Sequence, residues 1–303
     1  MIKRLAALVA LAIVVTGCAG TEQAEAHRIV VTTNILGDVV HSVVGDVVEV
    51  DVLMKRNADP HSFALSAQEA DRMAGADLIV TNGLGLEEGV QRHVDSAAGR
   101  GVPTLAVGDH VDPLPYTDGD SAGAPDPHFW MDPQRMIAAV DVIEQAVDDH
   151  LDGVDRAQVA ASAERYRQQL RTLAESMSRR FAEIPEARRN LVTNHHVMGY
   201  LADRYGLRVI GAVVPSGTTL ASPSPADLES LAGAIREAGV TTIFVDSSQP
   251  DRLARALADH AGVDGIEVVS LYTESLAEPG TPAGTYLDMV CANTDIIITG
   301  ISR

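Results

Sequence analysis

The sequence predicts an α/β protein with two lobes, each a mostly parallel sheet flanked by helices, joined by one long backbone helix. Short β-branched runs alternate with helical patterns in both halves of the chain, which is typical of parallel sheets covered on both faces. One uninterrupted helical pattern separates the two halves. The chain has 303 residues, a length suited to about two domains.

The first 17 residues are predicted to be an export signal. Lys3 and Arg4 precede an apolar run of 11 residues, which is too short to span a bilayer and suits the core of a signal peptide. The run ends in Val-Thr-Gly and Cys18, which looks like the lipobox of bacterial lipoproteins; an ordinary signal peptide is the alternative. We therefore expect Cys18 to be lipidated, residues 18–28 to form a tether, and the protein to be anchored to the outer face of the cytoplasmic membrane.

The N-terminal lobe is expected to span residues 29–152. Its apolar, β-branched runs predict strands at 29–33, 47–54, 77–81 and 104–107. Its helical patterns predict helices at 35–44, 67–74 and 86–98.

A long linking helix is expected within residues 153–184. Apolar residues recur there at helical spacing and form one stripe: Val159, Tyr166, Leu170, Leu173, Met177, Phe181 and Ile184. Such a helix would be about 45 Å long. We expect it to act as a rigid backbone rather than as part of either core, and two shorter helices with a break are the alternative.

The C-terminal lobe is expected to span residues 185–303. The predicted strands are 191–193, 208–214, 241–245 and 266–271, and the predicted helices lie near 197–205, 226–238, 250–261 and 285–298. Cys291 falls in the last of these helices and is expected to be an inert core thiol.

Composition excludes several classes of function. With 42 acidic and 23 basic side chains, the chain lacks the basic face that nucleic-acid binding needs. It contains neither the complete glycine fingerprint of a dinucleotide site nor a phosphate-binding loop, so no NAD or ATP is expected. Two cysteines are too few for a disulfide framework or a cysteine zinc site.

Four side chains follow strands and are candidate metal ligands. His61 comes after the strand 47–54, His128 after 104–107, His195 directly after 191–193, and Glu274 just past 266–271. Open α/β sheets bind ligands at the carboxyl ends of strands, and two candidates come from each half at equivalent places. Three imidazoles and one carboxylate fill the tetrahedral shell of Zn²⁺ and leave no position for an activated water. This donor set favours metal capture over catalysis.

Neighbouring residues raise further candidates. Asp59 and Asp126 each precede a histidine by two residues, so either could hold the free imidazole N–H, although simple turn geometry explains them equally well. His196 stands beside His195, and spacing does not decide which of the two binds. The loop 116–127 is rich in Asp, Gly, Ser and Pro and is expected to be a solvent loop.

Several motifs resemble the zinc/manganese ABC importer solute-binding lipoproteins (cluster A-I or cluster 9, ZnuA-like). The resemblance covers residues 28–301 and rests on the segments Ala58–Phe63 (ADPHSF), Asp126–Pro133 (DPHFWMDP), His195–Leu201 (HHVMGYL) and Thr273–Ser275 (TES). In that family the third ligand lies four residues before a Gly-Tyr pair, here Gly199 and Tyr200, which selects His195 over His196.

The resemblance implies a fold and a function. It implies two α/β lobes joined by a long helix, with one metal in the cleft, and a loaded protein that docks on the membrane permease of an ABC importer. We expect a monomer that is not an enzyme. The nitrogen-rich donors favour Zn²⁺ over Mn²⁺. A manganese-specific importer subunit is the alternative, followed by an extracellular metallo-hydrolase with Glu274 as general base. Because ligating imidazoles must be neutral, affinity is expected to fall as the pH drops through about 6.5 toward 5.

Overall fold

The structure is a computed structural model and describes residues 27–263 and 265–302. The predicted export signal, Cys18 and most of the predicted tether lie outside these residues. Within the described ranges, no helix combines the length and the apolar character needed to cross a membrane.

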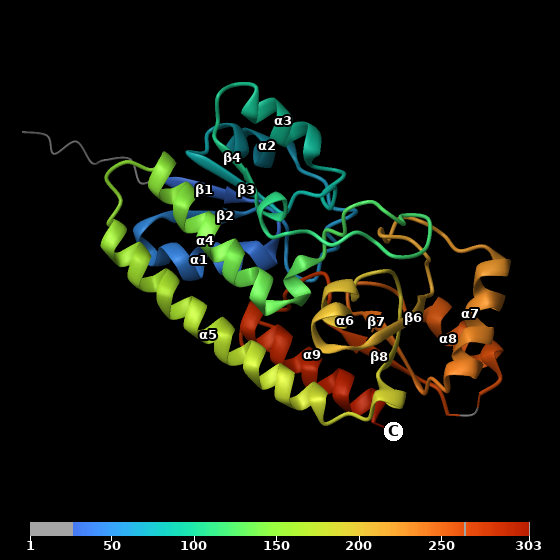
Figure 1. The fold of residues 1–303 in the computed structure, drawn as a ribbon. Coiled ribbons are helices and arrows are strands. Elements are labelled where there is room, and N and C mark those ends of the chain that lie inside the picture. The colour runs from blue at the N-terminus through green and yellow to red at the C-terminus, as the bar shows by residue number, and fades with distance from the viewer. Residues whose placement is uncertain (1–26, 264, 303) are drawn as a thin grey trace, which may run out of the picture.

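The N-terminal lobe is built on a four-stranded parallel sheet with the order β2-β1-β3-β4 (Figure 1). Its strands are β1 (Arg28–Val31), β2 (Glu49–Val52), β3 (Leu78–Thr81) and β4 (Thr104–Ala106). Its helices are α1 (Asn34–Val44), α2 (Ala67–Ala74), α3 (Gln91–Ala98) and α4 (Pro133–His150).

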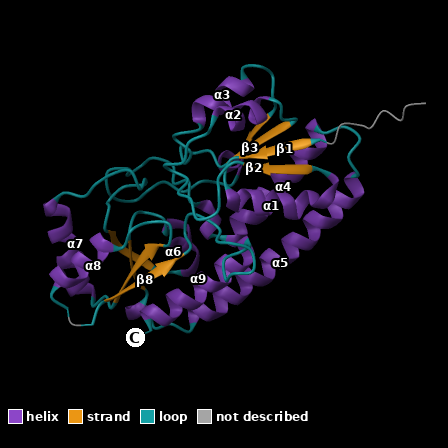
Figure 2. Cartoon of the chain, turned by 180° about the vertical axis from the view of Figure 1, so that it is seen from behind, coloured by secondary structure: helices purple, strands orange, loops and turns teal. Residues whose placement is uncertain are grey.

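The C-terminal lobe repeats this topology with the order β6-β5-β7-β8, again all parallel. Its strands are β5 (Asn190–Thr193), β6 (Arg208–Ala212), β7 (Thr242–Asp246) and β8 (Glu267–Leu271). Its helices are α6 (Gly199–Tyr205), α7 (Pro225–Ala238), α8 (Arg252–Ala261) and α9 (Tyr286–Ile301). Figure 2 shows that loops gather between the two sheets. The predicted fold class is confirmed.

Two helices of the N-terminal lobe differ from the prediction. α3 begins at Gln91 rather than at residue 86, and residues 86–90 form loop and turns. α4 was not predicted at all. Its start signal is nevertheless present in the sequence, since Asp132 caps the helix through the backbone N–H of Gln134 and Pro133 occupies the first turn.

The long linking helix is α5 (Arg156–Ala182), a continuous helix of 27 residues that runs past both lobes (Figure 1). All seven residues of its predicted apolar stripe are buried. They belong to one hydrophobic cluster that also contains residues of both lobes, because α5 packs on α1 and α4 of one lobe and on α6 and α9 of the other. The expectation that this helix stays outside the cores is therefore wrong.

Cys291 is also placed differently from the prediction. α9 buries Met289, Val290, Asn293 and Thr294, among others, against the rest of the molecule. Cys291 lies off this buried face and is exposed, so it is not a core thiol.

Candidate metal site

Four side chains from the segments that follow four strands meet between the two sheets. His61 follows β2, His128 follows β4, His195 follows β5 and Glu274 follows β8. Each of the four offers one nitrogen or oxygen atom, and these atoms all lie within 4.8 Å of one another. The structure thus brings together the whole set of residues that the sequence nominated as ligands.

The separations within this group resemble the edges of a coordination tetrahedron. The Nε2 atoms of His61 and His128 are 3.4 Å apart. Oε2 of Glu274 lies 3.7 Å from Nε2 of His61, whereas Oε1 lies 3.7 Å from Nε2 of His128 and 3.2 Å from Nε2 of His195. Zinc–nitrogen bonds of about 2.0–2.1 Å give tetrahedral edges of about 3.3 Å. One divalent cation therefore fits between the four side chains with small adjustments.

The group is buried, and several of its polar atoms lack partners. The four residues are at most 2% exposed. Within the described residues, both ring nitrogens of His195 and both carboxylate oxygens of Glu274 have no hydrogen-bond partner. Buried polar groups without partners are costly, so Nε2 of His195 and the carboxylate of Glu274, which lie 3.2 Å apart, suit a cation between them.

Burial changes the protonation of the group. Desolvation, reinforced by the neighbouring His128 and His195, lowers the pKa of His61 to about 2. Desolvation also lowers the pKa of His195. The same effect raises the pKa of Glu274 to about 8, against the opposing influence of His128. Near neutral pH, His61 and His195 are therefore neutral, and Glu274 keeps a proton that a metal must displace.

The two Asp-Pro-His motifs differ in structure although their sequences match. Asp126 accepts hydrogen bonds from both the backbone N–H of His128 (2.9 Å) and its Nδ1 atom (2.7 Å). This contact fixes the ring so that Nε2 faces the other three side chains. Asp59 accepts from the backbone N–H of His61 (3.0 Å), and the structure gives no bond from Asp59 to the imidazole.

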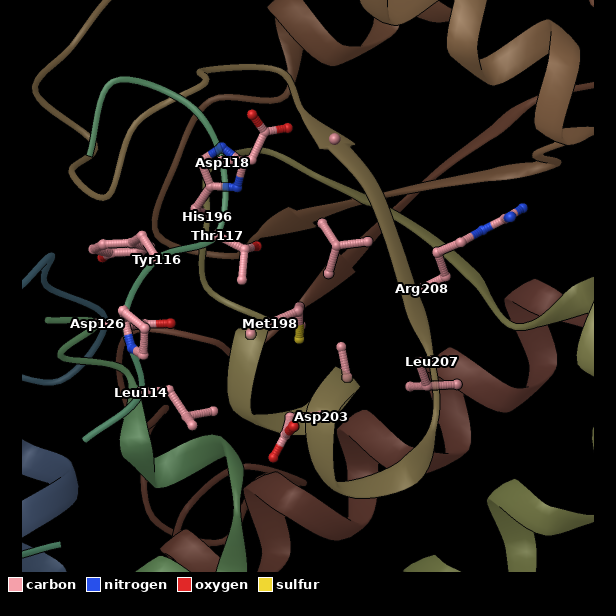
Figure 3. Close-up of a pocket in the computed structure, with 15 residues that line it drawn as sticks. Leu114, Tyr116, Thr117, Asp118, Asp126, His196, Met198, Asp203, Leu207 and Arg208 are labelled. Carbon is pink, nitrogen blue, oxygen red and sulfur yellow. The ribbon is translucent and has the colours of Figure 1, made fainter. Parts of the chain in front are cut away.

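His196 is outside the four-residue group. Its backbone N–H bonds to the carbonyl of Ser216, and its side chain lines a cavity of ≈ 580 Å³ beside the site (Figure 3). Tyr116 also lines this cavity, with its ring centroid 6.4 Å from that of His196. The structure therefore places His195, rather than His196, against Glu274.

The loop 116–127 is more than a solvent loop. The hydroxyl of Tyr116 lies 3.3 Å from Nδ1 of His128 and donates to the carbonyl of Gly217 in the C-terminal lobe (3.2 Å). A Cβ atom at Gly217 would lie 2.3 Å from this hydroxyl, so glycine is what allows the close approach. The loop thus connects the surroundings of His128 to the opposite lobe.

Sequence reasoning missed two residues that support Glu274. Asp246, at the end of β7, accepts from the backbone N–H groups of Thr273 (2.9 Å) and Glu274 (3.0 Å). Asn34, at the start of α1, bonds to the hydroxyl of Ser275 (2.7 Å) and to the backbone N–H of Leu276 (2.8 Å). Both residues sit at or just beyond the carboxyl end of a strand, so the rule that selected the four candidates could also have selected these.

The expected equivalence between the lobes holds for one pair of candidates only. His128 and Glu274 each follow the fourth strand of their lobe, whereas His61 follows the second strand of its lobe and His195 the first. The pair of His61 and His195 therefore breaks the symmetry, because His61 follows an edge strand and His195 follows an interior strand.

Comparison with known proteins gives consistent matches along the whole chain. The family model described as "Zinc-uptake complex component A periplasmic" (ZnuA) matches residues 29–300. The manganese-binding lipoprotein MntA of Halalkalibacterium halodurans is 27% identical over 302 residues, covering 98% of this chain and 97% of that protein. The zinc-binding protein TroA of Treponema pallidum is 30% identical over 285 residues, covering 92% and 91%.

A solved structure agrees with these matches. The periplasmic zinc-binding protein TroA from Treponema pallidum superposes with a TM-score of 0.82 at 28% identity, covering 92% of this chain and 100% of that one. The resemblance found in the sequence motifs is confirmed, and the chain belongs to the ZnuA family.

Proposed function

We propose that this protein is an extracytoplasmic binding protein that captures a divalent metal ion with high affinity and delivers it to the permease of an ABC importer. The observation that carries the proposal is the buried group of three imidazoles and one carboxylate. Relatives that cover almost the entire chain are named zinc-binding and manganese-binding proteins, which supports a metal as the transported substrate.

We propose His61, His128, His195 and Glu274 as the ligands and Zn²⁺ as the ion. Three nitrogen donors and one oxygen donor suit Zn²⁺, whereas Mn²⁺ sites generally have more oxygen donors. Mn²⁺ is the second candidate, because a relative with nearly complete coverage is named for manganese.

A transport role explains the site better than catalysis. Four protein donors complete a tetrahedral shell, and catalytic zinc sites usually keep one position for water or substrate. We therefore propose that the protein is not an enzyme. A metallo-hydrolase would require Glu274 to leave the metal and act as general base.

The remaining assignments follow from the sequence and from the relatives. We propose an export signal at 1–17, lipidation at Cys18 with a tether to residue 28, and anchoring to the outer face of the cytoplasmic membrane; relatives named as lipoproteins support the anchor. We also propose a monomer divided into lobes at 29–152 and 185–303 around a linking segment at 153–184.

Competition titration of the purified protein with Zn²⁺ and Mn²⁺, together with elemental analysis, tests the proposal. The wild-type protein should bind one zinc ion, and the double variant His61→Ala/His195→Ala should lose tight binding. His196→Ala is the matched control and should bind almost as tightly as wild type. If the double variant binds zinc as tightly as wild type, the ligand assignment is wrong.

A further inference from the structure

The carboxylate of Asp59 is shared between the two lobes. Besides the backbone N–H of His61, it accepts a hydrogen bond from the hydroxyl of Ser62 (3.1 Å) within its own turn. It also accepts from two residues of the C-terminal lobe, the hydroxyl of Thr219 (2.6 Å) and the amide of Gln249 (3.0 Å). Asp59 is only 9% exposed, so these bonds form in a largely water-excluded place.

These contacts matter because the candidate ligands are divided between the lobes. His61 and His128 belong to the N-terminal lobe, and His195 and Glu274 belong to the C-terminal lobe. A buried ion can leave only if the ligand pairs separate. If the two lobes move apart, the turn that carries His61 moves away from the C-terminal lobe, and the hydrogen bonds of Asp59 to Thr219 and Gln249 break.

Gln249 extends the connection to the opposite ligand. Its backbone N–H bonds to the carbonyl of Asp246 (3.1 Å). The carboxylate of Asp246 in turn accepts from the backbone N–H of Glu274 (3.0 Å). One chain of hydrogen bonds therefore runs from the turn that carries His61 to the loop that carries Glu274.

We propose that Thr219 and Gln249 are positioning residues that latch the turn of His61 to the C-terminal lobe through Asp59 and thereby slow the release of the bound metal. The inference rests on the proposed metal-binding function. It gives the two matching Asp-Pro-His motifs different tasks: Asp126 orients the ring of its histidine, whereas Asp59 ties its histidine's turn to the other lobe.

The test is a double-mutant cycle on zinc release. Purified Asp59→Ala, Thr219→Val and double-variant proteins are loaded with Zn²⁺ and mixed with excess chelator, and the dissociation rate is followed by stopped flow. Hydrogen bonds to a charged group are strong enough that Thr219→Val should release zinc about tenfold faster or more. The double variant should release it no faster than Asp59→Ala, because the two changes remove the same contact.

Two further variants separate a latch from a general packing effect. Thr219→Ser keeps the hydroxyl and should restore slow release. Ser222→Ala removes an exposed hydroxyl from the same loop and should release zinc at the wild-type rate. A general disturbance of the loop would instead leave Thr219→Ser fast.

The latch is refuted if wild type binds zinc but Thr219→Val releases it at the wild-type rate, if the effects of Asp59→Ala and Thr219→Val simply multiply, or if Thr219→Ser stays fast. Failure of wild type to bind either Zn²⁺ or Mn²⁺ would instead refute the proposed function. The two failures are therefore distinguishable in one set of measurements.

Discussion

The Nε2 atom of His195 lies 3.2 Å from Oε1 of Glu274, and within the described part of the chain neither atom has a hydrogen-bond partner. The two residues come from strands of the same lobe and face the two histidines of the other lobe. Because a neutral imidazole nitrogen and a carboxylate both offer lone pairs, the space between them suits either a proton on Glu274 or a cation. Proton and metal therefore compete for one place.

This competition predicts that zinc binding releases a proton. Burial raises the pKa of Glu274 to about 8, so at pH 6.5 the metal must displace the carboxyl proton. Affinity should rise with pH up to about 8 and then level off. Calorimetry in buffers of different ionisation enthalpy should detect about one proton released per Zn²⁺ at pH 6.5 and a value approaching zero at pH 9.

His61 and His195 should contribute little to this pH dependence, since burial lowers the pKa of His61 to about 2 and also lowers that of His195. The sequence alone placed the decline between pH 6.5 and 5, on the basis of ordinary imidazoles. If the affinity is constant from pH 9 to 6.5 and falls only below pH 6.5, Glu274 does not carry the proton that the metal displaces. The result would favour the expectation from the sequence that protonation of ordinary imidazoles weakens binding.

Glu274→Gln should change metal affinity and stability in opposite directions. A carboxyl group with a raised pKa favours the folded state at low pH, and this contribution is lost as the pH rises through about 8. Above that pH, the buried carboxylate costs the metal-free protein a few kcal/mol, because each tenfold change in a protonation equilibrium corresponds to about 1.4 kcal/mol. The neutral amide removes this cost, so the variant should melt at a higher temperature than wild type at pH 8.5.

The same variant should bind Zn²⁺ much more weakly in competition titration, because it loses the only anionic donor of the group. Glu278→Gln, at an exposed position nearby, is the control and should leave both the melting temperature and the affinity nearly unchanged. If Glu274→Gln melts at a lower temperature than wild type at pH 8.5, the buried carboxylate does not destabilise the metal-free protein.

The sequence predicted the fold class and nominated the four residues that the structure brings together, because strand patterns and strand-end residues are local features; the choice of His195 over His196 came from the family resemblance. The sequence was insufficient for contacts between segments far apart in the chain. Asp59 and Asp126 have the same local motif, but Asp126 bonds the ring of its own histidine, whereas Asp59 bonds Thr219 and Gln249 of the other lobe. Similarly, the apolar stripe of α5 was visible in the sequence, but the cores that it joins were not.

Asp126→Asn should weaken zinc binding by about 10–100-fold. The carboxylate accepts from Nδ1 of His128 at 2.7 Å and so keeps Nε2 free for a metal. An amide accepts this hydrogen bond more weakly and can also rotate to present its NH₂ group to the ring, which would favour the wrong tautomer. Competition titration measures the loss. Asp120→Asn, an exposed acid in the same loop, should bind like wild type, and equal affinities for the two variants would exclude this role for Asp126.

Phe181→Ala should destabilise both lobes together. Phe181 is 1% exposed, and its ring centroid lies 5.1 Å from that of Tyr205, which joins α5 to α6. Removing a buried aromatic ring of this kind costs about 3–5 kcal/mol. Because the hydrophobic cluster of α5 includes residues of both lobes, chemical denaturation should show one transition shifted to lower denaturant rather than two separate transitions.

Glu175→Ala, on the exposed face of α5, is the control for that experiment and should change the free energy of unfolding by less than about 0.5 kcal/mol. Two resolved transitions in Phe181→Ala, with only the one belonging to the C-terminal lobe displaced, would show that the lobes unfold independently. In that case the cluster that α5 shares with both lobes would contribute little to cooperativity.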